Sequence, residues 1–179
     1  MKKITLVLLS TLLSLAPMIH ADVSTPAPAK SAEAVWGTDF DAAVRQAKAD
    51  GKRILLDFTG SDWCGWCMRM ERETLSQPAF KDYAAQHLVL VTVDFPAHKD
   101  QSEADARQNR MLQERFGVNG FPCFVVLSPT GEEVDRQSGY LEGGPEAFIT
   151  FLRASENAET PAKPHASATG TGSNPATDK

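Results

Sequence analysis

The chain has 179 residues, three cysteines and a formal net charge of −5 at pH 7. An acidic chain offers no electrostatic footprint for nucleic acid, so we exclude nucleic-acid binding. One close pair of cysteines, one further cysteine and scattered histidines fall short of the two ligand pairs that a structural zinc site needs. We therefore expect neither a metal nor a cofactor.

Residues 1–21 have the pattern of a secretory signal peptide. Two lysines near the start precede an apolar core from Ile4 to Ala16, and Ala21 is a small residue at a candidate cleavage site. This core is short for a membrane span, which needs roughly 20 residues, although an uncleaved anchor stays open as the alternative. We expect the mature chain to begin near Asp22 and to be periplasmic or secreted.

Two segments have compositions that do not support folding. Residues 22–34 are rich in Ala, Pro, Ser and Thr, and residues 155–179 in Ala, Thr, Pro, Ser and Gly. Neither segment has enough large apolar side chains to offset the entropy of ordering it. We expect a flexible linker at 22–34, one domain at 35–154 and a disordered tail at 155–179.

The domain alternates helices with apolar strands, as its hydrophobic spacing shows. Helices are expected from a cap at Thr38 or Asp39 to Gly51, from about Cys64 to Pro78, over 79–86, over 102–115 and after Gly143–Pro145, and strands at 53–59, 87–95, 121–128 and 132–138. The first two strands, with helices between and after them, favour parallel pairing, and the turn at 129–131 makes a hairpin of the last two. The prediction is an α/β fold with a central mixed four-stranded β-sheet flanked by helices on both faces.

The motif Trp63-Cys64-Gly65-Trp66-Cys67 follows the first apolar strand and opens a helix. A Cys-x-x-Cys pair in this position is typical of a dithiol/disulfide redox site. Free backbone N–H groups at the helix start stabilise a thiolate, which is the form that attacks disulfides. A purely structural bridge is less favoured, because so small a loop constrains the unfolded chain little. A pair of inert buried thiols remains the alternative.

These features together resemble the thioredoxin superfamily over nearly all of residues 35–154. The resemblance rests on a strand ending in Asp57-Phe58, the motif at 63–67, Gly120-Phe121-Pro122 before a strand, and Gly139 after the hairpin. Residues 58–64 are similar to secreted bacterial thioredoxin-like proteins, including periplasmic oxidoreductases of the DsbH type. The resemblance implies a thioredoxin fold and thiol–disulfide oxidoreductase activity.

The resemblance also implies roles for the residues of the redox-active pair and its surroundings. Cys64 is the exposed nucleophile that forms a mixed disulfide with substrate, and the more buried Cys67 resolves it. Pro122 is a cis proline beside the pair, and the backbone around Phe121 and Pro122 pairs with substrate as a short added strand. An ordinary trans proline at a strand start is the alternative for Pro122.

Asp57 ends a strongly apolar strand, so a buried carboxyl group with a raised pKa is expected there. Such a group can relay a proton to or from Cys67. Thioredoxins carry the corresponding acid one residue closer to the first cysteine, which makes Asp62 a second, weaker candidate. The alternative for Asp57 is a strand-end acid that faces solvent.

Three further side chains lie near the motif in sequence or in the expected fold. Trp63 is expected to pack as a lid beside the sulfur atoms, and Trp66 to offer substrate an apolar contact, with simple packing as the alternative for both. Cys123 follows Pro122 and is either a second resolving thiol or, as we favour, a small buried apolar side chain.

Gly65 and Trp66, between the cysteines, supply no positive charge to the thiolate, so we expect a reducing pair. A reducing dithiol in an oxidising compartment must be recharged, which implies a DsbD-type membrane electron donor as partner, beside protein disulfides as substrates. We predict a monomeric disulfide reductase. An isomerase or an oxidase is the nearest alternative, and a thioredoxin-fold binding module with idle cysteines is an alternative of a different class.

Overall fold

The computed structural model describes residues 34–156. The predicted signal peptide, nearly all of the linker and residues 157–179 of the predicted tail lie outside the described residues. The elements are β1 (Trp36–Gly37), α1 (Phe40–Asp50), β2 (Arg53–Thr59), α2 (Gly65–Met70), the π-helical segment η1 (Glu71–Leu75), α3 (Pro78–His87), β3 (Leu88–Asp94), α4 (Glu103–Phe116), β4 (Cys123–Leu127), β5 (Glu133–Ser138) and α5 (Gly144–Glu156).

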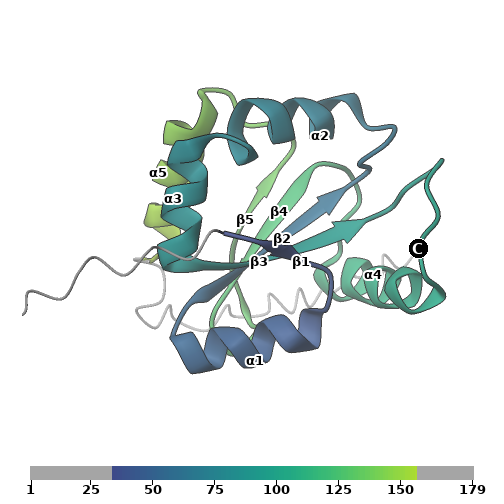
Figure 1. The fold of residues 1–179 in the computed structure, drawn as a ribbon, viewed down its shortest axis with the longest axis horizontal. Coiled ribbons are helices and arrows are strands. Elements are labelled where there is room, and N and C mark those ends of the chain that lie inside the picture. The colour runs from purple at the N-terminus through teal and green to yellow at the C-terminus, as the bar shows by residue number, and fades with distance from the viewer. Residues whose placement is uncertain (1–33, 157–179) are drawn as a thin grey trace, which may run out of the picture. The chain divides into compact units, whose positions relative to one another are not determined.

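The strands form one mixed sheet in the order β1-β3-β2-β4-β5 (Figure 1). Strand β2 pairs in parallel with β3 and antiparallel with β4, and β5 closes the hairpin with β4. The α/β fold and the mixed sheet are as predicted. The sheet has five strands rather than four, because Trp36 and Gly37 pair with Leu90 and Val91 of β3. A strand of two residues is too short to produce a hydrophobic period in the sequence.

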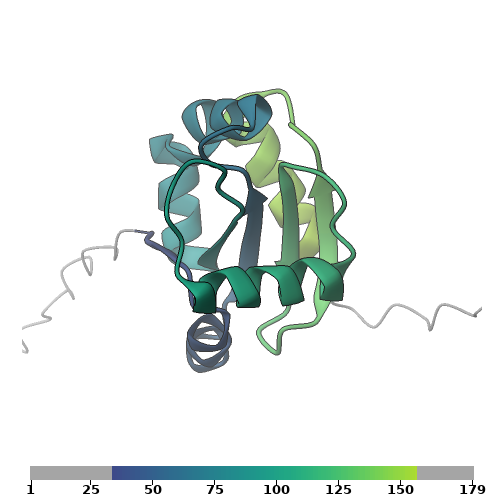
Figure 2. The ribbon, with the colours of Figure 1, turned by 90° about the vertical axis from the view of Figure 1, so that its right-hand side faces the viewer.

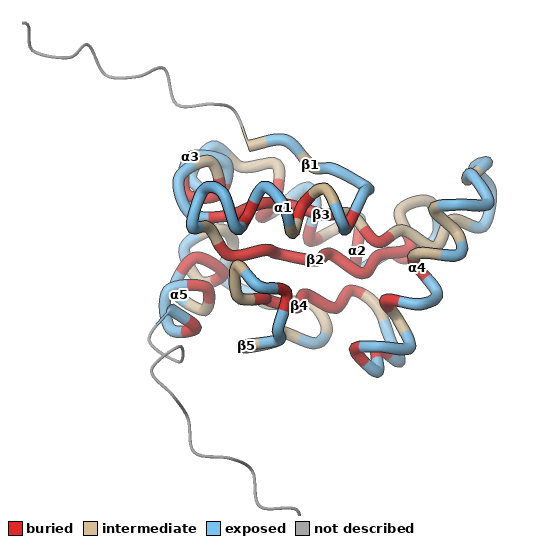
Figure 3. Tube along the Cα trace, turned by 90° about the horizontal axis from the view of Figure 1, so that it is seen from below, coloured by how far each residue is buried: buried red, intermediate tan, exposed pale blue. Residues whose placement is uncertain are grey.

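Helices cover both faces of the sheet, and the alternation of side chains along each strand decides which face they meet. Ile54, Leu56 and Phe58 pack in one core with residues of α1 and α4. Leu55, Phe124 and Val126 pack in a second core with residues of α2, α3 and α5. Figure 2 shows these two layers on opposite sides of the strands. Strand β2 is buried along its whole length (Figure 3).

The helix ends show why the chain turns where it does. Asp39 caps α1 by accepting a hydrogen bond from the Ala42 N–H, and Gly51 ends it in the left-handed region at φ 66°. The helix predicted from Cys64 towards Pro78 is instead split into α2 and the π-helical η1. Within residues 34–156 no helix has both the length and the apolar composition required to cross a bilayer.

The buried Arg53 joins the start of β2 to the end of α5. Its guanidinium donates to the Leu152 carbonyl at 2.9 Å, to the Tyr83 hydroxyl at 3.2 Å and to a Glu156 carboxylate oxygen at 2.7 Å. A buried guanidinium requires such partners, because an unpaired one is costly to desolvate. Helix α5 ends at Glu156, past residue 154, where the sequence predicted the domain to end.

We expect Arg53→Met to lower the free energy of unfolding by about 3 kcal/mol, since it leaves several buried acceptors without a donor. The measurement is urea denaturation of the oxidised protein. Arg107→Met is the matched control, because its ion pair with Glu103 is solvent-exposed and contributes less than about 1 kcal/mol. Equal losses in the two variants would contradict this account of Arg53.

Candidate active site

The Cys64–Cys67 pair lies where the chain leaves β2 and enters α2. Residue 64 has extended backbone angles and is the N-cap of α2, and its N–H donates to the Gly60 carbonyl at 2.8 Å. The two cysteines form a disulfide, with their Cα atoms 5.2 Å apart. The backbone N–H of Cys67 points at Cys64 Sγ at 3.2 Å. A helix-start amide is therefore already aimed at the sulfur that would carry the thiolate charge.

The expected difference in exposure between the two cysteines is absent in the disulfide form. Cys64 is 7% exposed and Cys67 is 5% exposed, so the expectation of an exposed Cys64 is wrong for this state. The sulfur of Cys64 is turned towards the helix, where it bonds Cys67 and accepts its N–H. What separates the two cysteines is their place in the helix: Cys64 is the cap and Cys67 lies in the first turn.

Asp57 lies beneath the pair as a buried carboxyl group. Its side chain shares the sheet face of Leu55 and is 8% exposed, so the alternative of a solvent-facing acid is wrong. Burial, then the charges of Glu71 and Asp94, raises the pKa of Asp57 to about 8. Its Oδ1 has no hydrogen-bond partner among the described residues. The group is therefore mostly protonated at pH 7 and titrates about one pH unit above it, close enough to neutral pH for a proton carrier.

A pocket of about 470 Å³ joins Asp57 to Cys67. Its lining includes both of these residues, the threonines Thr59 and Thr92, and Glu71 on η1. The pocket thus places Asp57 and Cys67 on the wall of one cavity. Asp62, the weaker candidate for the proton relay, does not line it. Its carboxylate instead accepts backbone N–H groups of residues 97–99.

Trp63, the residue before Cys64, packs against Phe121, and the two rings form an aromatic wall. Their rings meet edge to face with centroids 6.0 Å apart, and Trp63 remains 48% exposed. The indole N–H donates to the Phe95 carbonyl at 2.7 Å, and a Cβ at residue 60 would collide with the indole ring. Glycine at 60 thus lets the indole lie flat against the backbone. The Phe121–Pro122 peptide bond is cis, as the resemblance implies.

Trp66 belongs to a second polar and aromatic cluster. Its ring is 56% exposed and lies 5.5 Å from that of Tyr140, and Arg69 stacks over Tyr140 at 4.6 Å. Arg69 also donates to both carboxylate oxygens of Glu73, which accepts from the Tyr140 hydroxyl at 2.6 Å. The Tyr140 hydrogen bond and then Arg69 hold the pKa of Glu73 below its ordinary value. The cation nearest in sequence to the pair is thus already paired.

Cys123 faces away from the redox pair. It packs with Phe58 and Val125 in the core that α1 and α4 cover, whereas Asp57 faces the α2 side. Burial raises the pKa of the Cys123 thiol, and its sulfur lies 3.9 Å from the Ser138 hydroxyl. The structure therefore favours the apolar core role for Cys123 over that of a second resolving thiol.

Sequence reasoning missed four residues that shape this site: Phe95, Asp94, Glu73 and Tyr140. In the sequence, Phe95 is simply the end of an apolar run, yet its carbonyl accepts the hydrogen bond of the Trp63 indole N–H. Tyr140 follows Gly139, one of the positions that carried the resemblance, so an aromatic there deserved notice as a neighbour of the motif. The contacts of Asp94 and Glu73 have no local pattern that predicts them.

Comparisons with known proteins agree with this geometry. A family model described as a thioredoxin-like domain matches residues 40–156. The disulfide bond reductase DsbH of Chlamydia pneumoniae is 35% identical over 71% of this chain and 75% of its own length. The thiol:disulfide interchange protein DsbD of Ralstonia nicotianae is 32% identical over 65% of this chain, but over only 17% of its own length.

Among solved structures, one titled DsbH oxidoreductase superposes with a TM-score of 0.67 at 33% identity and covers 76% of this chain and 93% of its own. Both the sequence and the fold are therefore shared over the segment that holds the site. The chain belongs to the thioredoxin-like family, and its Cys64–Cys67 disulfide occupies the start of the helix that follows the central strand.

Proposed function

We propose that this chain is a monomeric thiol–disulfide oxidoreductase that reduces protein disulfides in the periplasm or outside the cell. The observation that carries the proposal is the Cys64–Cys67 disulfide at a helix start, above a buried carboxyl group that shares a pocket with Cys67. The similarity to a protein named disulfide bond reductase supports the direction of the reaction. The sequence pattern of residues 1–21 supports the location.

The reaction takes two thiol–disulfide exchanges. The Cys64 thiolate attacks one sulfur of the substrate disulfide, and the other sulfur leaves as a thiolate that takes up a proton. Cys67 then loses its proton and attacks Cys64, which releases the second substrate sulfur and leaves the Cys64–Cys67 disulfide. Two electrons pass from the dithiol to the substrate. Asp57 accepts the Cys67 proton in this step and returns it when the pair is reduced again.

The charges around the pair favour a reducing dithiol. Residues 65 and 66 carry no charge, Arg69 is bound by Glu73, and the carboxyl groups of Asp57 and Glu71 line the pocket beside Cys67. Arg72 also lines the pocket, but its side chain is 69% exposed and solvent screens its charge. A thiolate without a nearby cation is poorly stabilised, which keeps the reduction potential low.

We therefore expect a reduction potential below about −220 mV, in the range of glutaredoxins and thioredoxin. The measurement is equilibration with glutathione, using Cys123→Ser so that only the redox pair titrates. A value near −120 mV is that of a strong oxidant and would make the chain an oxidase.

A reducing dithiol in an oxidising compartment must be recharged after each turnover. We propose a membrane electron donor of the DsbD type as the partner that supplies the two electrons. Its test is the redox state of Cys64 and Cys67 in cells with and without such a donor, read by thiol alkylation. A pair that stays reduced without the donor would contradict this partnership.

A further inference from the structure

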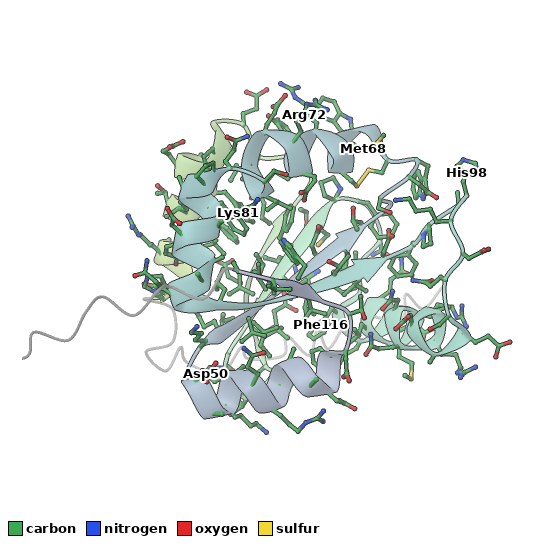
Figure 4. The ribbon with its side chains drawn as sticks, in the orientation of Figure 1. Asp50, Met68, Arg72, Lys81, His98 and Phe116 are labelled. Carbon is green, nitrogen blue, oxygen red and sulfur yellow. A yellow bond between two sulfur atoms is a disulfide. The ribbon has the colours of Figure 1, made fainter. Side chains whose placement is uncertain are left out.

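One carboxylate makes three hydrogen bonds between the active-site segment and the loop from β3 to α4, residues 95–101. The two oxygens of Asp62 accept hydrogen bonds from the backbone N–H groups of Ala97, His98 and Lys99 at 2.9, 2.7 and 2.9 Å. These bonds, that of Ala97 foremost, hold the pKa of Asp62 below its ordinary value. Figure 4 labels His98 on this loop, on the same side of the sheet as Met68 of α2.

Two more contacts join the same pair of segments. Asp94 accepts hydrogen bonds from the backbone N–H and the hydroxyl of Ser61, at 2.9 and 2.5 Å. The Trp63 indole donates to the carbonyl of Phe95. Three consecutive residues of the active-site segment, 61–63, thus each bond a residue of 94–99. The segment ahead of Cys64 and the start of the loop consequently form one hydrogen-bonded unit.

The loop also carries an aromatic ring into the wall of the site. Phe95 stacks on Phe121 with centroids 5.1 Å apart and an interplanar angle of 22°, and Phe121 meets Trp63 edge to face. The rings of Trp63, Phe95 and Phe121 come from three separate loops, which follow β2, β3 and α4. Phe95 supplies both the carbonyl that accepts the Trp63 indole N–H and the ring that stacks on Phe121. A shift of Phe95 therefore displaces both contacts.

We propose that Asp62 is a positioning residue for protein substrates, which fixes the 95–101 loop so that Trp63 and Phe121 form a preordered wall beside Cys64. This inference rests on the proposed reduction of protein disulfides. A polypeptide that lies across Cys64 contacts this wall, whereas a small disulfide reaches the sulfur without it. Preordering matters because each side chain left to order on binding reduces affinity.

The carboxylate of Asp62 can hold the 95–101 loop more strongly than the neutral amide of an Asn side chain could. Both of its oxygens accept, and charge-assisted bonds to amides are roughly twice as strong as neutral ones. An Asn side chain keeps one accepting oxygen and directs an NH₂ group at the remaining amides. Asp62→Asn is therefore an intermediate variant, and Asp62→Ala removes all three carboxylate bonds to the loop.

The test compares two substrates of different size for each variant. We expect Asp62→Ala to raise the KM for insulin about tenfold and to leave kcat within about twofold, with Asp62→Asn between it and the wild type. The rate with hydroxyethyl disulfide and the reduction potential should not change. Asp39→Ala is the matched control, because it also removes a carboxylate that accepts a backbone N–H, at the start of α1.

Each of the following results would contradict the proposal. An unchanged KM for insulin in Asp62→Ala, or an equal loss with insulin and with hydroxyethyl disulfide, overturns the positioning role. A loss of the same size in Asp39→Ala shows a general destabilisation and overturns it as well. A wild-type chain that leaves insulin intact contradicts the proposed function itself, and the positioning role with it.

Discussion

Replacing Cys64 by serine should reduce the rate of insulin reduction by at least about 10³-fold, to that of the uncatalysed reaction. Cys64 is the helix cap, and its sulfur is the one that the Cys67 amide faces. Serine keeps the cap but is not a nucleophile towards disulfides. The measurement is the turbidity of insulin B chains in the presence of dithiothreitol.

The Cys67→Ser variant should be blocked at the second thiol–disulfide exchange, which releases the substrate. The Cys64 thiolate still attacks, but no second thiol releases the substrate, so mixed disulfides accumulate and can be seen on a non-reducing gel. Cys123→Ser is the matched control and should keep near wild-type activity, since that side chain packs on the other face of the sheet. Mixed disulfides that form through Cys67 in Cys64→Ser would reverse the two roles.

Asp57→Asn should change both the stability and the pH profile of the protein. The pKa of Asp57 is about 8 when folded, against an ordinary value of 3.8 that the unfolded chain should show. Between these pH values the folded state holds a proton that the unfolded state does not. The stabilisation is complete below pH 4 and is lost as the pH rises towards 8. Wild-type stability should fall by about 1.4 kcal/mol per pH unit across this window relative to Asp57→Asn.

The same variant tests the proton relay. An amide cannot take the Cys67 proton, so release of the substrate should slow by about 10- to 100-fold and the rate should lose its inflection near pH 8. Water in the adjoining pocket substitutes in part, which limits the loss. Asp41→Asn, at an exposed position on α1, is the control for both measurements. A pH profile identical to that of the wild type would exclude Asp57 as the relay.

Much of this fold could be predicted because local patterns specify it. The apolar run at 53–59 is long enough to indicate a strand covered on both faces, and Asp39 and Gly51 mark the ends of a helix. The two-residue β1 carries no such period. Its position depends on pairing with β3 and on the stacking of Trp36 against Phe80, which are tertiary contacts.

The sequence predicts the redox cysteines of the site well, but it predicts less well which side chains hold the surrounding loops in place. Cys64 and Cys67 carry a spacing that indicates their chemistry, and the strand pattern implied a buried Asp57. The hydrogen bonds of Asp62 to the loop have no signal in the sequence, because its partners lie 35 to 37 residues away. The position of the Cys123 side chain is also hard to predict from the sequence. The backbone of Cys123 lies near the site because it follows Pro122, but side chains alternate along a strand, and that of Cys123 points to the other face of the sheet.

The hydrogen bonds of the buried Arg53 make the start of β2 depend on the end of α5. The strand that carries Asp57 begins at a guanidinium whose partners include Ser155 and Glu156, at the very end of α5. A chain shortened at residue 154 keeps every strand and the redox motif, yet it leaves a buried cation with fewer partners. Loss of the last helical turn should therefore destabilise the strand that leads to the redox site.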